Sequence, residues 1–331
     1  MLKYLITLMV IYILISSACN SDKIKIGYLV PNSKSERYIK EQKYFVDKIS
    51  ALGGEAIVAS AEYDDKLQIT QAREMINNGV KVLVVNSVNM NTAAAIVREA
   101  HKNNVQVIAY DRLIKNSDVD YYISFDNIKV GRLMAENIIL QKPEGNFVLI
   151  GGDKADLNAV LVNKGIMDVL TKPINEGKIN IGYNVYIEDW SGENAYYELK
   201  QYLNLSGIIP DAILSSYDGM TAGCISALEE KGLAGKVLIT GQDAELEACR
   251  NIVNGRQTLT IYKPLKALAE KAAEISFKMA ANESFEKPVS TIDNGFKPVS
   301  CILLEPKLVD KSNMKTSIIA DGFYSENQIY N

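Results

Sequence analysis

Charged and polar residues stand at the ends of apolar runs throughout this chain. In "VIAYDRLIKNSDVDYYISFDN" (107–127), one apolar run ends in Asp111 and Arg112, and the next ends in Asp126 and Asn127. Later runs end in "GGDKADLN", "EDW", "SSYD", "GQD" and "YKP". Together with two residues from an early segment, these endings supply a candidate binding set: Arg37, Tyr38, Arg112, Asp156, Asn158, Trp190, Asp243 and Lys263.

This combination of side chains suits a neutral ligand that carries many hydroxyl groups. A sugar hydroxyl both donates and accepts hydrogen bonds, so it pairs well with a carboxylate beside a guanidinium, an ammonium or an amide. The apolar C–H faces of a pyranose ring pack on aromatic rings, for which Trp190 and Tyr38 are candidates. Trp190 lies between Asp189 and Ser191 rather than inside an apolar run, which favours ligand contact over a core position.

The sequence lacks the residue patterns that catalysis, phosphate binding or metal binding would require. The single histidine, His101, lies near the end of a helical segment, where a positive charge suits the helix dipole, so no nucleophile–base pair is predicted. The glycine pair 151–152 is followed by Asp153 and Asp156, which would repel a phosphate group. Neither a catalytic residue nor a cofactor nor a metal is therefore expected. Three widely spaced cysteines predict core positions rather than a metal or disulfide site: Cys224, Cys249 and Cys301.

Each aspartate that follows a strand has a second interpretation, because such a residue often caps the next helix. Asp126 and Asp218 fit that role as well as they fit a ligand site. Seven polar endings, several of which carry Arg, Asn, Lys or Trp, exceed what capping alone requires. In an open parallel sheet, ligands bind outside the carboxyl ends of the strands, where a ligand can satisfy buried polar groups.

The elements that must position these residues alternate along the chain. Amphipathic helical segments separate near-continuous apolar runs, which is typical of parallel sheets covered on both faces. The rhythm restarts after Asn127, so we expect an α/β protein with two doubly wound lobes. The predicted strands are 24–30, 55–60, 81–87, 105–111 and 120–126, then 146–153, 179–189, 211–218, 236–243 and 257–264.

The net charge and the first residues of the chain indicate its partners and its location. A net charge of −4 with scattered signs gives no basic face, so nucleic acid is not an expected partner. The apolar run 4–15 is shorter than the roughly 20 residues of a membrane-spanning helix and precedes small residues, so 1–18 is a predicted signal peptide. Cys19 follows directly, as in a bacterial lipoprotein, and is the expected lipid site. The mature protein would lie in the periplasm or on the outer face of the cell membrane; an uncleaved anchor is the alternative.

The most specific stretches of the chain are "AYDRLIKNSDVDYYISFDN", "GLAGKVLITGQDAEL", "QTLTIYKPL" and "DGFYSEN". On these stretches it resembles the periplasmic sugar-binding proteins of the pentose and hexose type, most closely their D-xylose-binding members, over nearly all of 23–325. The resemblance implies two Rossmann-like lobes with parallel sheets, three hinge crossings and a ligand cleft between the lobes (periplasmic binding protein type I). The implied lobes are 23–127 plus 265–304 and 128–264 plus 305–331, with crossings near Asn127, Lys263 and 304–307.

The resemblance also implies roles for individual residues. Arg37 and Arg112 would bind sugar hydroxyls from the first lobe, and Asp111 is expected to orient Arg112. Tyr38 and Trp190 would sandwich the sugar ring. The hydroxyl-binding residues of the second lobe would be Asp156, Asn158, Asp243 and the hinge-proximal Lys263.

Two positions depart from the D-xylose-binding pattern. Tyr38 replaces a tryptophan, which is a mild exchange between aromatic residues. Tyr217, in "SSYDGMTAG", stands where the family has a ligand-binding asparagine. Its larger side chain is expected to shrink the pocket or to replace an amide contact with a phenol, so another monosaccharide is an alternative ligand.

The function that the resemblance implies is that of an extracytoplasmic D-xylose receptor, which closes on the sugar and delivers it to an ABC sugar importer. The alternative is a receptor that signals D-xylose to a membrane histidine kinase of a two-component system. A repressor of the lactose-repressor type shares the two-lobe core, but the predicted signal peptide occupies the place of its DNA-binding helices. An enzyme is not expected, because the sequence has no catalytic constellation.

Overall fold

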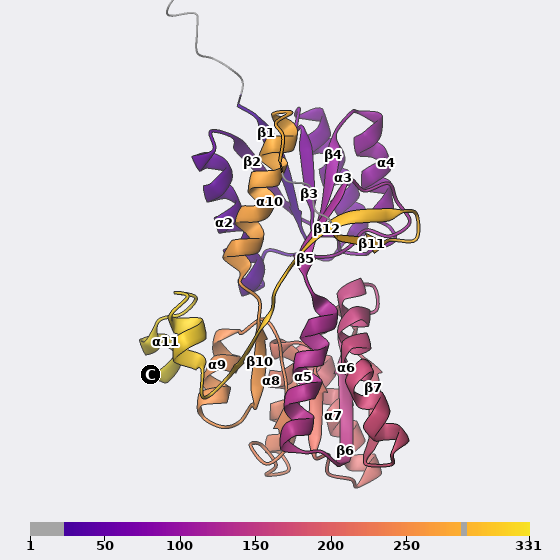
Figure 1. Cartoon of the computed structure of the whole chain (residues 1–331), viewed down its shortest axis with the longest axis vertical. Coiled ribbons are helices and arrows are strands. Elements are labelled where there is room, and N and C mark those ends of the chain that lie inside the picture. The colour runs from indigo at the N-terminus through magenta and orange to yellow at the C-terminus, as the bar shows by residue number, and fades with distance from the viewer. Residues whose placement is uncertain (1–22, 286–289) are drawn as a thin grey trace, which may run out of the picture.

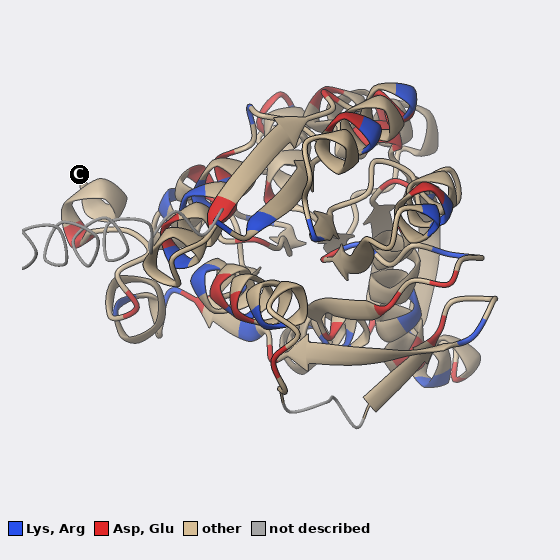
Figure 2. Cartoon of the chain, turned by 90° about the horizontal axis from the view of Figure 1, so that it is seen from above, with Lys and Arg blue, Asp and Glu red and all other residues tan. Residues whose placement is uncertain are grey.

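The computed structural model describes residues 23–285 and 290–331 and divides them between two lobes, one above the other in Figure 1. The predicted signal peptide 1–18 and Cys19 lie outside the described residues. Within the described ranges, no helix is long and apolar enough to span a bilayer. Figure 2 colours the ribbon by residue type, and Lys and Arg are interspersed with Asp and Glu along it, as the scattered charges of the sequence predicted.

The first lobe is built on a seven-stranded sheet in the order β11-β12-β5-β4-β3-β1-β2. All neighbours pair in parallel except β11 and β12. The strands are β1 (Lys25–Val30), β2 (Glu55–Ser60), β3 (Val82–Val85), β4 (Gln106–Tyr110), β5 (Tyr121–Phe125), β11 (Ser290–Asp293) and β12 (Pro298–Leu304).

Helices cover both faces of this sheet, which is why its strands are apolar on both sides. Helices α2 (Glu36–Ala51) and α10 (Leu265–Ala280) cover one face, where Phe45 and Ile49 of α2 are fully buried. Helices α3 (Asp65–Asn77) and α4 (Ala94–Lys102) cover the other. His101 lies in the last turn of α4, as the sequence predicted.

The second lobe has a four-stranded parallel sheet in the order β7-β6-β8-β9. Backbone hydrogen bonds from Ile261 and Asp243 continue it from β9 to β10, which then pairs antiparallel with β13. The strands are β6 (Gly145–Gly151), β7 (Ile179–Tyr186), β8 (Ala212–Ser215), β9 (Leu238–Ile239), β10 (Leu259–Tyr262) and β13 (Lys307–Asp310). The helices are α5 (Asn127–Gln141), α6 (Leu157–Asn175), α7 (Gly192–Ser206), α8 (Asp218–Glu229), α9 (Leu246–Val253) and α11 (Glu326–Tyr330).

The chain passes between the two sheets three times. It leaves the first lobe between β5 and α5, returns between β10 and α10, and leaves again between β12 and β13. The predicted fold class, a type I periplasmic binding protein architecture with mostly parallel sheets, is confirmed. We propose that the lobe boundaries are 23–127 plus 265–304 and 128–264 plus 305–331.

The two aspartates with two interpretations differ in the structure. Asp126 caps α5, because its carboxylate accepts a hydrogen bond from the backbone N–H of Lys129 at 2.9 Å. Asp218 is the first residue of α8 and does not cap it; its buried carboxylate accepts hydrogen bonds from Thr260 and from the backbone N–H of Glu245. The three cysteines of the described chain are buried and free, as predicted.

Candidate functional site

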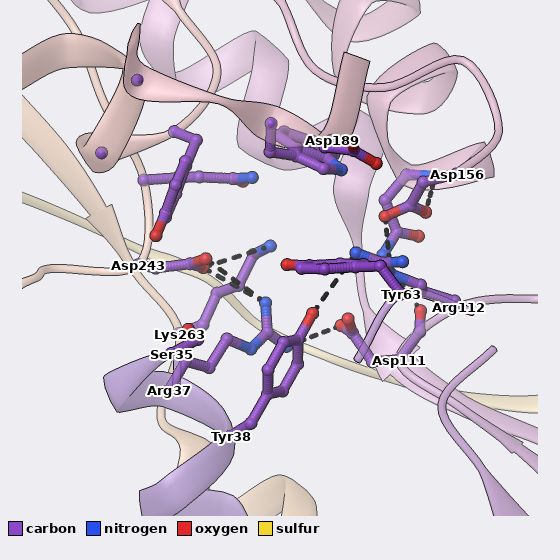
Figure 3. A pocket seen from close by; sticks show the side chains of 16 residues that line it. Ser35, Arg37, Tyr38, Tyr63, Asp111, Arg112, Asp156, Asp189, Asp243 and Lys263 are labelled. Atoms are coloured by element: carbon purple, nitrogen blue, oxygen red, sulfur yellow. Dashed lines mark hydrogen bonds and ion pairs between the residues drawn. The ribbon is translucent and has the colours of Figure 1, made fainter. Parts of the chain in front are cut away.

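A cavity of about 270 Å³ lies between the lobes, and the carboxyl ends of strands from both sheets surround it (Figure 3). All the candidate residues predicted from the sequence line this one cavity, although they come from separate parts of the chain. They are Arg37, Tyr38, Arg112, Asp156, Asn158, Trp190, Tyr217, Asp243 and Lys263. Their role in holding a ligand stays a prediction.

Arg112, which directly follows β4 and Asp111, is buried against groups of both lobes. Its Nε lies 2.8 Å from Oδ2 of Asp156, across the cleft, and its Nη2 lies 3.3 Å from the hydroxyl of Tyr38. Nη1 donates to the backbone carbonyl of Ser87 at 3.2 Å. The guanidinium is therefore held by three protein groups, and its ion pair with Asp156 joins the two lobes.

Arg37, in the first turn of α2, forms the second charged centre. Its Nε lies 3.2 Å from Glu41 and its Nη2 lies 2.8 Å from Asp111. Its Nη1 lies 3.4 Å from Asp243 of the second lobe, and Asp243 also lies 3.5 Å from the buried ammonium of Lys263. The expectation that Asp111 orients Arg112 is wrong, because the Asp111 carboxylate pairs with Arg37 instead.

Burial and charge act in opposite directions on the carboxylates of the site. Burial alone would raise the pKa of Asp111, but the positive charges of Arg37 and Lys263 outweigh burial and lower it. Burial raises the pKa of Asp156 despite the charge of Arg112. Burial also raises the pKa of Glu41 to about 7, because this carboxylate lies behind Arg37 and has no exposed surface.

Asp156 and Asn158 connect the cavity to the interface between the lobes. Asp156 caps α6 through the backbone N–H of Asn158, so one carboxylate serves both the helix and Arg112. The amide of Asn158 donates to the carbonyl of Asp111 at 3.1 Å and accepts from the amide of Asn127 at 2.9 Å. Together with the pairs Arg112–Asp156 and Arg37–Asp243, these bonds hold the cleft shut.

Aromatic side chains form the rest of the cavity wall. Trp190 follows β7 in a turn where it and Asp189 both have φ of 55°, a left-handed conformation that costs energy for residues with a Cβ. Its indole lies so close to Gly152 that a Cβ at this position would overlap the ring. Tyr217 packs edge-on against it, with the ring centroids 6.2 Å apart and an interplanar angle of 88°.

Five further side chains line the cavity that were not in the predicted binding set: Ser35, Tyr63, Asp111, Asp189 and Gln242. Gln242 and Asp189 stand in the strand endings "GQD" and "EDW", directly beside the predicted site residues Asp243 and Trp190. Tyr63 lies just beyond the end of β2, in the segment "AEYDD", which carries no amide, guanidinium or ammonium group to mark it as a binding segment. Its φ of 63°, unusual for an aromatic residue, marks a turn shaped to present the ring.

The site combines paired charges, amides and aromatic rings, and it has no arrangement for metal binding or nucleophilic attack among the described residues. No group of three or more metal-ligating side chains occurs within the described ranges. The buried charges of the cavity are paired with one another, and the remaining carboxylate, Asp189, is exposed. Such a site can hold a neutral, hydrogen-bonding ligand between two aromatic faces.

Comparisons with known proteins agree with this description. The chain is 42% identical to the D-xylose-binding periplasmic protein of Haemophilus influenzae and 39% identical to that of Escherichia coli, over 98% of each chain in both cases. The crystal structure of an ABC transporter solute binding protein from Clostridium phytofermentans with bound β-D-glucose has a TM-score of 0.86 and 29% identity, covering 92% of this chain and 99% of that one. A family model described as a periplasmic binding protein domain matches residues 26–284. The chain therefore belongs to the periplasmic binding protein family, as its sequence indicated.

Proposed function

We propose that this protein is an exported D-xylose receptor that closes on the sugar between its lobes and delivers it to an ABC importer. The observation that carries the proposal is a cavity in which charged groups compensate one another beside aromatic faces. The names of the relatives from Haemophilus influenzae and Escherichia coli support D-xylose as the ligand. Like these relatives, the chain is proposed to bind its ligand without transforming it.

The charge balance favours a neutral ligand. The largely buried part of the cavity wall carries three cations and three carboxylates, and every one of them pairs with an opposite charge within 3.5 Å: Arg37, Arg112, Lys263, Asp111, Asp156 and Asp243. The fourth carboxylate of the lining, Asp189, is exposed to solvent. A charged ligand would leave one of the paired groups uncompensated in a buried site, which is costly. Sugar hydroxyls instead add donors and acceptors to groups that are already fixed in position.

The size of the cavity agrees with a single sugar ring. Its volume of about 270 Å³ lies just below the ~300–1,000 Å³ typical of sites for drug-sized ligands. A monosaccharide that contacts both lobes stabilises the closed arrangement only, so binding shifts the population toward it. The transport partner would then recognise the closed lobes.

The test is calorimetry of the purified protein with D-xylose, D-ribose, L-arabinose, D-glucose and D-galactose, with D-glucuronate as a charged control. We expect the largest affinity for D-xylose and no measurable binding of D-glucuronate. If another of the sugars releases or absorbs heat on binding and D-xylose does not, D-xylose is rejected as the ligand. Absence of heat with all of the neutral sugars would reject the receptor itself.

The partner of the closed form and the mode of anchoring belong to the same proposal. Delivery to an importer is favoured, and signalling to a membrane histidine kinase is the alternative, which the departure at Tyr217 supports as a feature of a specialised sensor. Sugar-dependent co-purification with a transporter permease, rather than with the extracellular part of a sensor kinase, would support delivery.

Lipid attachment at Cys19 is proposed as the mode of anchoring. It predicts that the protein is bound to the membrane and that Cys19→Ser releases it.

A further inference from the structure

Tyr217, which lines the cavity, is held by contacts with three other residues. Its hydroxyl lies 2.5 Å from Oε1 of Glu245 and donates to it. Its ring packs edge-on against Trp190 and lies against Gly219, where a Cβ would approach the ring to 2.6 Å. The ring is therefore held at its hydroxyl by Glu245, by edge-on packing against Trp190 and by close contact with Gly219.

Glu245 is in turn fixed by the start of α9. Its backbone N–H donates to Oδ2 of Asp218 at 3.0 Å, and the same carboxylate accepts from Thr260 of β10 at 2.8 Å and from Gln257 at 2.9 Å. Tyr217 at the start of α8 is thus tied through Glu245 and Asp218 to a strand of the sheet. Glu245 does not line the cavity itself, so its effect on a ligand would pass through Tyr217.

This corner of the cavity differs from the rest of the wall. Trp190, Tyr217, Gly192 and Gly219 meet here, and the phenolic proton of Tyr217 is already engaged by Glu245. The other side carries the guanidinium, ammonium, amide and carboxylate groups that suit hydroxyls. A sugar ring satisfies both sides best when a carbon without a hydroxyl faces the aromatic corner.

We propose that Tyr217, held by Glu245, makes the site select aldopentopyranoses over aldohexopyranoses. A pentopyranose has a bare methylene at C5, which packs against the aromatic ring. A hexopyranose carries a hydroxymethyl group there, which would collide with the fixed ring and lose its hydration without gaining a partner. Tyr217 is then the specificity-determining residue and Glu245 a positioning residue; this inference rests on the proposed sugar receptor.

The test compares D-xylose with D-glucose, which share the same hydroxyl stereochemistry from C2 to C4 and differ by the hydroxymethyl group. The wild type is expected to prefer D-xylose by about 10–200-fold, the range for a small group that a pocket excludes. In Tyr217→Ala the preference should fall to a few-fold, chiefly because D-glucose binds more tightly. Tyr197→Ala, which removes an exposed tyrosine of α7, is the matched control and should keep the wild-type preference.

Two further variants separate the ring from its anchor and guard against a folding defect in Tyr217→Ala. Tyr217→Phe and Glu245→Ala both keep the ring but remove the hydrogen bond, so each should give a preference between those of the wild type and Tyr217→Ala. Glu245→Gln keeps an acceptor and should retain the preference. An unchanged xylose-to-glucose ratio in Tyr217→Ala and Tyr217→Phe would overturn the inference while leaving the receptor intact. A wild type that binds neither sugar would overturn the proposed function, and the inference with it.

Discussion

Two of the contacts between the lobes differ in chemistry, and one helix of the first lobe contributes to both. In the cleft, Arg37 of α2 pairs with Glu41 and reaches Asp243 of the second lobe. One residue earlier along the same helix, Glu36 and Lys40 form a second pair at 3.0 Å. Because successive helix positions are rotated by about 100°, these two i,i+4 pairs face different directions.

The second pair faces the C-terminal segment, and we call this set of residues the tail contact: Glu36, Lys40, Phe323 and Tyr324. The ammonium of Lys40 lies 3.7 Å from the ring centroids of both aromatic residues and donates to the carbonyl of Phe323. The hydroxyl of Tyr324 donates to Glu36 at 2.7 Å. The segment itself belongs to the second lobe, since β13 pairs with β10 and Tyr324 packs in a cluster with residues of α9.

The difference between the cleft and the tail contact shows which contacts a ligand can affect directly. Groups in the cleft line the cavity, so a sugar adds to their hydrogen bonding and depends on their geometry. Groups of the tail contact lie outside the cavity lining, so a sugar cannot touch them. Changes in the cleft should therefore alter affinity strongly and selectively, whereas changes in the tail contact should act weakly and equally on all ligands.

The largest effect is expected from Arg112→Ala. It removes the guanidinium and leaves Asp156 buried without its partner, which typically costs about 2–5 kcal/mol. Calorimetry should show a loss of D-xylose affinity of about 30-fold or more. Arg132→Ala is the matched control, because Arg132 pairs with Asp168 on the surface. An unchanged affinity in Arg112→Ala would mean that the cleft pair does not support the ligand.

A somewhat smaller effect is expected from Gly152→Ala, which tests the aromatic wall without removing any polar group. The added methyl group would overlap the indole of Trp190 and displace it from the cavity. Affinity should fall about tenfold or more. Trp190 is the single tryptophan of the chain, so its fluorescence reports the displacement directly.

The neighbouring glycine supplies the control for that experiment. A Cβ at Gly151 would lie 3.2 Å from the ring of Tyr186, which has room to adjust at its partly exposed position. Gly151→Ala should therefore leave the tryptophan fluorescence and the affinity close to the wild type. Equal effects of the two substitutions would show that the strand, rather than Trp190, is the sensitive element.

The positions of the site residues followed from the sequence, whereas their pairing did not. Arg112, Asp156 and Lys263 follow strands, and parallel strands bring such endings to one edge, so local pattern was sufficient. The partner of Asp111 was wrongly predicted because this residue has φ of 60°, and no local pattern marked a turn that separates its carboxylate from the adjacent Arg112. The bond between Tyr324 and Glu36 spans 288 positions, a separation at which periodicity carries no information.

A moderate effect on stability is expected from Glu245→Gln, which lies between the two kinds of contact. Burial raises the pKa of Glu245 to about 7, with help from the charges of Asp243 in the cleft and Glu36 in the tail contact. Between about pH 4.5 and 7 the folded state then holds a proton that the unfolded state has released. Stability from this group is therefore gained as the pH falls through that window and is lost as the pH rises.

Urea unfolding at pH 5 and pH 7.5 measures this difference. In Glu245→Gln the stability difference between the two pH values should shrink by about 1–2 kcal/mol, since one pKa unit is worth ~1.4 kcal/mol and the group is partly exposed. Glu247→Gln, on the exposed side of α9, should leave the difference unchanged. A wild-type difference retained in Glu245→Gln would assign the pH dependence to other buried carboxylates, such as Glu41, whose pKa burial raises to about 7, and Asp218, whose pKa burial also raises.

The smallest effect is expected from Lys40→Ala, which removes the cation between the two rings of the tail contact. A partly exposed cation–π interaction is worth about 0.5–1 kcal/mol, so affinity should fall by about two- to fivefold. Because the closed arrangement loses support that no ligand touches, the loss should be the same for D-xylose and D-glucose. Lys43→Ala removes a more exposed lysine of the same helix and should change neither affinity. An altered ratio of the two sugars in Lys40→Ala would show that the tail contact reaches the cavity through α2, and that the two contacts are one system.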